Sequence, residues 1–295
     1  MTPAAQLGWR AGLISLVIFG CLLLVWHLAT APGQRVASAG AGAASAATSA
    51  AEDEYARLMG KGSGSPVKTS GFPGLAQMGQ TIRKELAHPF YDNGPNDKGI
   101  GIQLGYSLAR VGLGFVIAAV VAIPLGFLLG MSPLMQRALN PFIQILKPIS
   151  PLAWMPLALY TIKDSSISGI FVIFICSVWP MLMNTAFGVA SVRRDWLNAA
   201  KTLEVKPLRK AFLVILPAAA PTILTGMRIS MGIAWLVIVA AEMLVGGTGI
   251  GYYVWNEWNN LSLTSVIFAI LLIGVTGMLL DLVFARLQKL VTYTE

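Results

Sequence analysis

The chain has 295 residues, of which 56% are hydrophobic and only 12% are charged, and its mean hydropathy is +0.70. These values lie outside the ordinary range of soluble domains, so they argue against a soluble enzyme or a nucleic-acid-binding module. Cys21 and Cys176 lie in hydrophobic windows, and His27 and His88 are far apart. The sequence therefore predicts neither a disulfide framework nor a metal site.

Six hydrophobic windows along the chain are long enough to cross a bilayer core. Each must be helical, because lipid offers no partner for an exposed backbone N–H or C=O group. Their approximate bounds are 11–31, 103–131, 139–162, 167–192, 219–245 and 261–280. The sequence predicts an all-α integral membrane protein with about six transmembrane helices.

Composition divides the chain into three parts. Residues 1–31 form an N-terminal anchor or, because Ala29-Thr30-Ala31 resembles a cleavage site, a cleaved signal segment; both interpretations stay open. Residues 32–102 form an external region that begins with an Ala-, Ser- and Gly-rich flexible linker. An interfacial helix is expected around 75–87, and the main membrane domain covers 103–290.

Charge asymmetry predicts the orientation in the membrane. The loop 193–210 carries six Lys or Arg residues against two acidic ones, and the tail after the last window carries Arg286 and Lys289. Both segments are therefore expected in the cytoplasm under the positive-inside rule. Counting back through alternating helices places the long 32–102 region outside and the N-terminus, like the C-terminus, inside.

One face of the second window consists of small residues at every fourth position. Such a face allows close helix packing in lipid. Two interpretations are open: static packing, or packing on the third or the fifth window within a moving bundle. The members of this face are Gly114, Ala118, Ala122, Gly126 and Gly130.

The third window is interrupted by prolines at 141, 148, 151 and 156, each of which disturbs a helix. Two interpretations are open for it: a broken element beside a translocation path, or a kinked packing helix whose Lys147 reaches the cytoplasmic surface. In the fifth window, Arg228 should face the bundle interior or find a partner, because a buried charge is costly there. Glu242 lies nearer the outer end, where it is expected to cap or pair.

The segment Asn198-Ala199-Ala200-Lys201-Thr202-Leu203-Glu204, with Val214-Ile215-Leu216-Pro217 downstream, resembles the "EAA" loop of bacterial ABC importer permeases. Two positions depart from that pattern, because Asn198 replaces a glutamate and Glu204 replaces a glycine. The resemblance implies a short helical hairpin, within a coupling loop 193–217, that docks on a separate ATPase subunit. The implied coupling residues are Asn198, Ala199, Ala200, Lys201, Leu203, Glu204, Leu216 and Pro217.

Further segments are similar to the nitrate/nitrite branch of these permeases, among them Pro89–Gly94, Ser177–Pro180, Asn184-Thr185 and Gly226–Ile229. The resemblance implies a type I ABC importer transmembrane domain in a bacterial inner membrane, which would move nitrate or nitrite. It also implies as partners a second permease copy, ATPase subunits that hold ATP and Mg, and a periplasmic or lipid-anchored substrate-binding protein.

The chain itself is expected to bind no cofactor and to have no catalytic site, since the glycines at 246–251 lack the Gly-Lys-Ser/Thr of a phosphate loop. Bicarbonate, cyanate and small sulfonates remain alternative substrates. Two alternative classes also remain open: an ion-coupled secondary anion transporter, and a membrane scaffold without transport, which would not explain the spacing of the loop. The candidates for the translocation path are Arg110, Lys147, Trp154, Asn184, Arg228 and Glu242.

Overall fold

The computed structural model of the chain describes residues 3–30, 73–94 and 97–291. The predicted linker at the start of the external region lies outside the described residues. The chain divides into two compact units, 1–80 and 81–295, with the boundary inside helix α3. The two units are considered separately.

The first unit contains α1 (Pro3–Thr30), whose segment Gly12–Thr30 is long and apolar enough to cross a membrane. The indole N–H of Trp26 donates a hydrogen bond to the carbonyl oxygen of Pro73 at 3.0 Å, which ties the end of α1 to the chain before α3. Helix α3 (Leu75–Ala87) forms where a helix is predicted.

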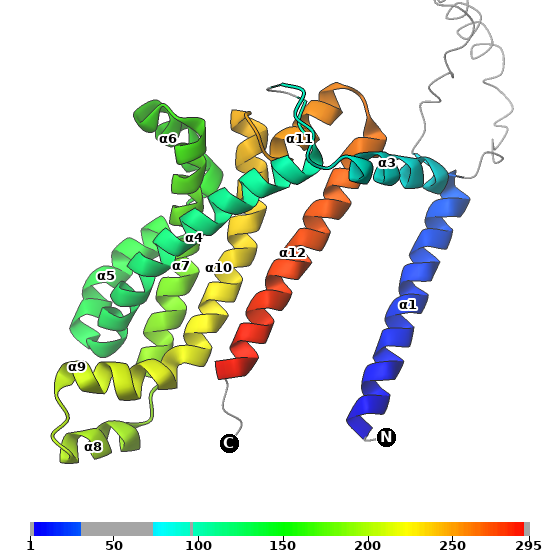
Figure 1. Cartoon of the computed structure of the whole chain (residues 1–295). Coiled ribbons are helices and arrows are strands. Elements are labelled where there is room, and N and C mark those ends of the chain that lie inside the picture. The colour runs from blue at the N-terminus through cyan, green and yellow to red at the C-terminus, as the bar shows by residue number, and fades with distance from the viewer. Residues whose placement is uncertain (1–2, 31–72, 95–96, 292–295) are drawn as a thin grey trace, which may run out of the picture. The chain divides into compact units, whose positions relative to one another are not determined.

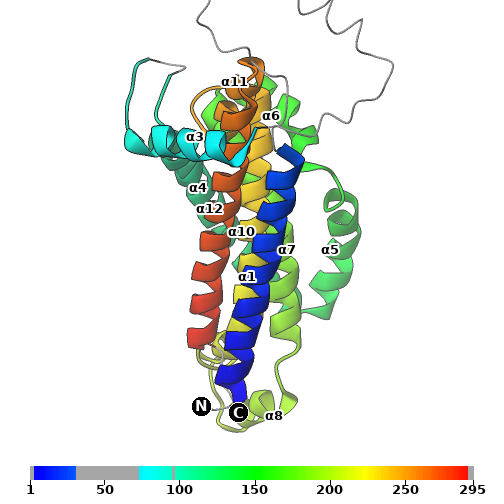
Figure 2. The ribbon, with the colours of Figure 1, turned by 90° about the vertical axis from the view of Figure 1, so that its right-hand side faces the viewer.

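The second unit is entirely helical in its regular elements within the described residues, and Figure 1 shows their order. Helix α7 packs against both α4 and α10, and α12 packs against α10 (Figures 1 and 2). In the described residues, five helices can span a membrane, or six if the bent pair α5–α6 counts as one span, which confirms the predicted number. The elements after α3 are α4 (Ile100–Met131), α5 (Pro133–Leu146), η1 (Pro151–Trp154), α6 (Met155–Ile162), α7 (Ser165–Ala190), α8 (Arg194–Thr202), α9 (Pro207–Lys210), the π-helical turn η2 (Ala211–Ile215), α10 (Leu216–Val245), α11 (Ile250–Asn259) and α12 (Leu263–Val291).

The small-residue face of α4 packs on α7, the fourth predicted window, so the expected partner was wrong. A Cβ atom at Gly114 would lie 2.8 Å from Ile173, and one at Gly126 would lie 2.6 Å from Thr185. The third window is broken and bent and offers no straight surface of matching length, whereas α7 is an unbroken helix of 26 residues. The close approach of backbones that small residues allow is therefore used between α4 and α7.

The break expected in the third window is confirmed. Helices α5 and α6 meet at an angle of 83° across a short break that contains Lys147 and Pro148. Lys147 is exposed at the C-terminal end of α5, and Pro151 opens the 3-10 turn η1 that leads into α6. Proline lacks a backbone N–H and cannot continue the preceding helix, which explains why the chain turns here.

Two helices extend further than the sequence suggests. The helical segment that ends in α10 begins at Pro207, so the whole of Pro207–Val245 counts as one candidate span, and Pro217 lies in the first turn of α10. Because Pro217 cannot donate to the turn before it, the preceding residues form the π turn η2, in which the N–H of Leu216 bonds to Ala211 O.

Helix α12 continues to Val291, so Arg286 and Lys289 lie in its last turns and not in a tail. The extension has packing partners in the same unit. Phe284 makes an edge-to-face contact with Phe115 of α4 at a centroid distance of 5.4 Å. One turn later, the side chain of Gln288 donates a hydrogen bond to Thr225 Oγ1 of α10 at 2.9 Å.

Candidate functional site

The segment that resembles a coupling loop forms a helical hairpin, as the resemblance implies. Helix α8 ends at Thr202, the chain turns at Leu203 and Glu204, and α9 returns it toward α10. Leu203 at the tip is 76% exposed, which suits an apolar side chain that docks elsewhere. Backbone hydrogen bonds from Leu203 N–H to Ala199 O and from Val205 N–H to Ala200 O hold the turn.

The two alanines of the hairpin differ in their surroundings. Ala200 is only 5% exposed and faces its own chain, whereas Ala199 is exposed. The side chain of Ala200 therefore packs within the hairpin's own chain, and its place in the expected coupling set stays a prediction. Of the pair, Ala199 is the one available at the surface.

Glu204 takes a backbone conformation that favours glycine. Its φ angle is 49°, in the left-handed region that costs a non-glycine residue energy. This is the position at which the resembled pattern has glycine, so the backbone of the turn is the one that a glycine would form. The departure at Glu204 changes the side chain without changing the turn.

A groove lies beside the hairpin, between α8 and the start of α10. It has a volume of about 300 Å³ and is lined by Trp196 from α8 and by Leu213, Val214, Pro217 and Ala218. Leu216, the neighbour of Pro217 in the expected coupling set, packs with the buried cluster of Val189, Ile215 and Ala219. Leu197 of α8 packs against the same cluster, so the hairpin is connected to the core at the end of α7 and the start of α10.

At the other end of α10, a buried ion pair joins helices that are far apart in sequence. Arg110 of α4 lies with its Nη1 atom 2.8 Å from Oε1 of Glu242 in α10. The side chains are 12% and 4% exposed, respectively. Arg110 also donates to the carbonyl oxygen of Thr248 at 2.6 Å and to Ser166 Oγ of α7 at 3.0 Å.

The carboxylate of Glu242 has further hydrogen-bond donors around it. Ser107 Oγ lies 2.9 and 2.8 Å from its two oxygens, and the backbone N–H of Gly251 donates to Oε2 at 3.0 Å. Ser107 in turn accepts the N–H of Ile250 at 2.9 Å. A carboxylate buried this deeply requires such partners, because an unpaired buried charge is strongly unfavourable.

Two glycines are needed for this arrangement. A Cβ atom at Gly249 would overlap the carboxyl group of Glu242, and one at Gly251 would overlap the carbonyl oxygen of Val239. The glycines that suggest a phosphate loop in the sequence thus let the chain fold tightly over a glutamate. We call Ser107, Arg110, Ser166, Glu242, Thr248, Ile250 and Gly251 the Glu242 network.

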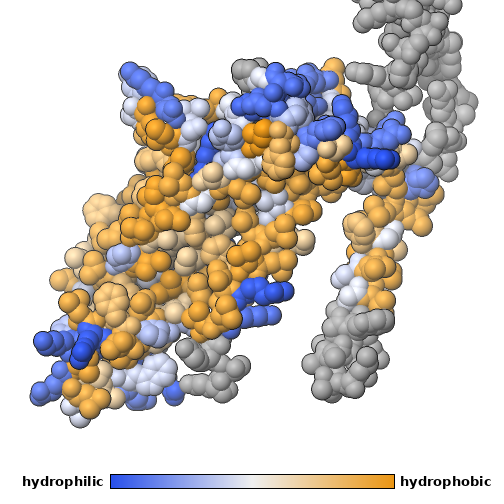
Figure 3. Space-filling model, viewed as in Figure 1, coloured by the Kyte–Doolittle hydropathy of each residue, from blue (hydrophilic) through white to orange (hydrophobic). Residues whose placement is uncertain are grey.

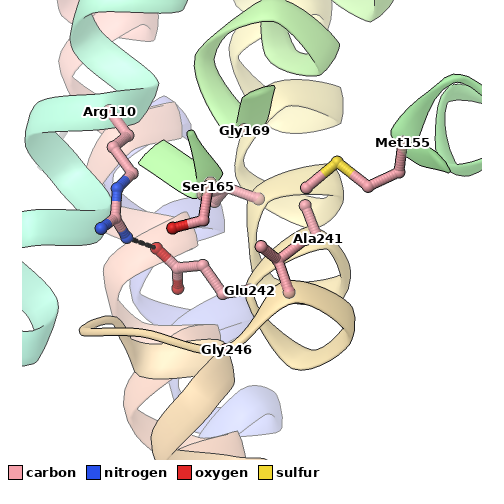
Figure 4. A pocket seen from close by; sticks show the side chains of 9 residues that line it. Arg110, Met155, Ser165, Gly169, Ala241, Glu242 and Gly246 are labelled. Atoms are coloured by element: carbon pink, nitrogen blue, oxygen red, sulfur yellow. Dashed lines mark hydrogen bonds and ion pairs between the residues drawn. The ribbon is translucent and has the colours of Figure 1, made fainter. Parts of the chain in front are cut away.

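A small cavity lies against this network (Figure 4), with Arg110 and Glu242 joined at one side of it and Met155 at the other. Its volume is about 10 Å³, roughly the room that one water molecule needs. The guanidinium charge of Arg110 is balanced by Glu242. In this conformation the network joins α4, α7, α10 and the start of α11. The cavity beside the arginine is too small for an anion.

The remaining candidates for the path are dispersed. Arg228 of α10 makes a two-point ion pair with Asp281 of α12, at 2.5 Å from Nε to Oδ1 and 2.6 Å from Nη2 to Oδ2. Asn184 donates to Pro180 O within α7, and Trp154 lies in η1 with no acceptor for its indole N–H among the described residues. The structure therefore brings together Arg110 and Glu242 only.

Sequence reasoning missed two contributors. Asp281 lies one residue beyond the predicted end of the last helix, so it is not recognised as the partner that Arg228 requires. Ser107 looks like an ordinary helix residue, although Glu242 needs several donors. The signal for each is the same: an isolated charge in a hydrophobic window demands a partner in another window.

With this geometry in place, comparison with known proteins identifies the class. Residues 122–293, more than half of the chain, match the family described as "Binding-protein-dependent transport system inner membrane component". The chain belongs to this family. It is a multi-pass inner-membrane permease subunit of an ABC importer.

Two relatives within the family show which kinds of permease the chain is similar to. The chain is 44% identical to the "Nitrate import permease protein NrtB" of Synechocystis sp., over 77% of this chain and 82% of the relative. It is 44% identical to the "Bicarbonate transport system permease protein CmpB" of the same organism, over 71% of this chain and 75% of the relative.

Solved structures confirm the type I importer fold at much lower identity. The chain matches the MetNI methionine ABC transporter in inward-facing conformations with a TM-score of 0.57 at 16% identity, over 64% of this chain and 94% of the other. It also matches an amino acid ABC transporter with a TM-score of 0.51 at 15% identity, over 75% of this chain and 97% of the other.

Proposed function

We propose that this chain is the permease subunit of an ABC importer that moves nitrate and nitrite into the cytoplasm. The observation that carries the proposal is the 44% identity, over 82% of its length, to a protein named as a nitrate import permease. The proposal includes a second permease copy, two ATPase subunits that bind ATP and Mg, and an external substrate-binding protein. This chain supplies the path and no ATPase site.

The α8–α9 hairpin is proposed as the contact with the ATPase. Its exposed tip residue Leu203 and the exposed Ala199 offer the surface, and α9 continues through η2 into α10. Movement of the hairpin therefore acts on a helix that also bears Arg228 and Glu242. In the proposed cycle, ATP-driven closure of the ATPase pair moves the hairpins and opens the path outward, and hydrolysis returns it inward.

The orientation in the proposal follows from charge. The hairpin region carries Arg193, Arg194, Lys201, Lys206, Arg209 and Lys210, which places it in the cytoplasm together with both chain ends. The path is proposed to run between two copies, with Arg110, Lys147, Trp154, Asn184, Arg228 and Glu242 as the candidates for contact with it. Of the two arginines among these candidates, Arg228 has the more exposed side chain, at 38% against 12% for Arg110.

Bicarbonate is the second candidate substrate, because a protein named as a bicarbonate permease is 44% identical over 71% of this chain. Cyanate and small sulfonates follow from the resemblance alone. An ion-coupled secondary transporter is not supported, because the chain belongs to a family of binding-protein-dependent systems.

The test is reconstitution. The permease, its ATPase and its binding protein should be placed together in liposomes, and ATP hydrolysis measured with nitrate, nitrite, bicarbonate, cyanate and taurine. Stimulation by nitrate and nitrite alone would support the proposal, while stimulation by bicarbonate alone would transfer it to the second candidate. Failure of the chain to form a complex with any ATPase would overturn the permease role itself.

A further inference from the structure

The exposed seam between α10 and α12 carries charge at membrane depth. The side chains of Arg228 and Asp281 are 38% and 51% exposed, although both helices are long and apolar enough to span a membrane. At 1.5 Å per residue, Arg228 lies roughly 18 Å from Leu216 and roughly 26 Å from Val245 along α10. Figure 3 shows hydrophilic atoms set into the hydrophobic surface over the lower half of α12.

Lipid is a poor cover for this seam. Charged groups inside a bilayer are costly and normally face protein or a water-filled cavity. A further polar contact, from Gln288 to Thr225 Oγ1, joins the same two helices near Arg228 and Asp281. The ion pair fixes the two charges in one place, but it leaves both of them partly uncovered on the outside of this unit.

Small residues flank the charged pair on the same exposed side. Gly232 is one helical turn from Arg228, and Gly274 is two turns from Asp281, so each glycine shares a helix face with its charge. Both glycines are exposed, and nothing lies within 4 Å of where their Cβ atoms would be. Open glycines on a membrane helix allow another helix to approach closely.

We infer that the seam defined by Thr225, Arg228, Gly232, Gly274, Asp281 and Gln288 is the surface on which a second copy of this chain docks, with Arg228 of each copy facing Asp281 of the other. The charge pattern selects this occupant. A two-fold axis pairs a residue of one copy with a different residue of the second and the reverse, so a face with one cation and one anion is complementary to itself. The inference rests on the proposed homodimeric permease and adds the face that it uses.

The apolar part of α1 is the alternative cover within the chain, but it lacks the matching charge. Its segment Gly12–Thr30 contains no Asp, Glu, Lys or Arg, so it would leave the pair no better covered than lipid does. A second copy supplies two charges of the required signs. The exposed pairs of the two copies would together form one ring of four alternating charges.

A charge-exchanged variant tests this inference while preserving the pair inside each chain. In Arg228→Asp/Asp281→Arg the ion pair is reversed, so dimers of two wild-type copies and dimers of two exchanged copies both keep opposite charges face to face. In a mixed dimer, Asp would face Asp and Arg would face Arg, and such like-charge contacts are strongly unfavourable. Two differently tagged copies should be co-expressed with the ATPase, and the mixed dimers measured by pull-down through one tag.

We expect mixed dimers to fall at least about fivefold below the two matched combinations. The control is Asp92→Lys/Lys98→Asp, which reverses a partly exposed 3.5 Å pair outside the membrane helices and should mix freely with wild type. Free mixing of the Arg228/Asp281 exchange would overturn the inference. If wild-type ATP hydrolysis and transport were normal in that case, the proposed function would stand without it; a complex with a single permease copy would instead contradict the proposed function.

A second measurement uses the native charges and does not depend on the folding of the exchanged variant. Cys21 and Cys176 are replaced by Ser and Ala, and Gly232→Cys and Gly274→Cys are placed on separately tagged copies. A short bis-maleimide should link the two copies. Leu279→Cys is the matched control, because Leu279 is 54% exposed on α12 but points about 160° away from Asp281 at 100° per residue, and it should not link.

The native Cys21 tests whether α1, and not a second copy, lies on the seam. With Cys21 restored and Gly274→Cys present, a link within one chain would show that α1 lies on the seam. That result, or equal linking through Gly274→Cys and Leu279→Cys, would overturn the inference.

Discussion

The guanidinium of Arg110 on α4 lies 2.8 Å from the carboxylate of Glu242 on α10, although 132 positions separate the two residues. Since Glu242 is 4% exposed, neither charge can be compensated by bulk water if the other is removed. The pair therefore holds α4 and α10 together only while both partners are present.

A double-mutant cycle measures this relationship. Arg110→Met leaves a buried carboxylate unpaired and should reduce the free energy of unfolding by about 3–5 kcal/mol. Arg110→Met/Glu242→Gln should cost clearly less than the sum of the two single changes, because no charge remains and the Gln amide oxygen can still accept from Gly251 N–H. The measurement is thermal unfolding of the purified chain in nanodiscs, and additive effects would show that the pair contributes no coupling.

Gly249→Ala tests whether the tight fold over Glu242 depends on the missing side chain. The φ angle of Gly249 is 163°, an extended backbone that any residue adopts, so the expected loss comes only from overlap of the new methyl group with the carboxyl group of Glu242. We expect a lower unfolding temperature and a loss of about 1–3 kcal/mol, the usual cost of overpacking.

The control for Gly249→Ala is Gly112→Ala in α4, where nothing lies within 4 Å of the added Cβ atom. Alanine is favoured over glycine inside a helix, so this change should be neutral or should stabilise by up to about 1 kcal/mol. Equal effects of the two substitutions would contradict the overlap.

Ser107→Ala should lower the free energy of unfolding more than most serine-to-alanine changes. The Ser107 hydroxyl donates to Glu242 and accepts a hydrogen bond from Ile250 N–H at the start of α11. Removal leaves a buried donor unsatisfied, and we expect a loss of about 1–3 kcal/mol. Ser168→Ala is the matched control: Ser168 is also fully buried, but its hydroxyl bonds only to Asp164 O at the start of its own helix. Thermal unfolding compares the two, and a larger effect at Ser168 would contradict the assignment.

Substitutions at two neighbouring alanines of the hairpin distinguish an effect on ATPase docking from an effect on folding. Ala199→Glu places a charge on an exposed surface, so the unfolding temperature should remain while co-purification of the ATPase falls at least about tenfold. Ala200→Glu forces a charge into a position that is 5% exposed, and both stability and co-purification should fall. Leu261→Glu, in the turn between α11 and α12 and 82% exposed, should change neither. Unchanged ATPase recovery with Ala199→Glu would remove that residue from the contact.

Glu204→Gly should stabilise the turn of the hairpin. The φ angle of 49° costs a glutamate on the order of 1 kcal/mol that glycine avoids. Amide hydrogen exchange of 199–206 should slow in this variant, and ATPase recovery should not decrease, whereas Glu204→Val should accelerate exchange. If Glu204→Gly abolished ATPase recovery, the carboxylate itself, and not the turn, would carry the contact.

Stability should also depend on pH through Glu85 at the end of α3. Partial burial raises the pKa of this carboxyl group above its usual value, and the nearby Glu257 raises it further, against a lowering by Lys84. A raised folded-state pKa means that the folded chain binds the proton more tightly, so this contribution is present at low pH and is lost as pH rises through the folded pKa. Glu85→Gln should flatten the unfolding temperature between about pH 4 and pH 7. An identical pH profile in the variant would exclude Glu85 as its source.

The sequence predicts the membrane helices well because hydrophobic length is a local property. The window 103–131 becomes α4 almost residue for residue, and the prolines of the third window correctly indicate its break. The helix ends are less predictable: α12 continues past Leu280 because Phe284 and Gln288 find partners on α4 and α10, which no local pattern reveals.

The contacts between helices could not be predicted from the same information. Small residues at every fourth position indicate that α4 packs closely, but they do not say on which helix, because α7, α10 and α12 are all long and apolar. Likewise, the sequence indicates that Glu242 and Arg228 each need a partner. That these partners are Arg110 and Asp281, respectively, follows only from the three-dimensional arrangement.

The π turn at 211–215 gives α10 a mechanical character of its own. Pro207–Val245 is one helical rod of 39 residues with a locally widened turn near its base, where Pro217 also withholds a hydrogen bond. Pro221 withholds another hydrogen bond inside α10, so the rod is weakened from the π turn to Pro221, close to the hairpin, and is regular beyond it. A displacement of the hairpin would therefore rotate α10 about this region. The movement would be largest at the far end of the helix, where Glu242 joins α10 to α4.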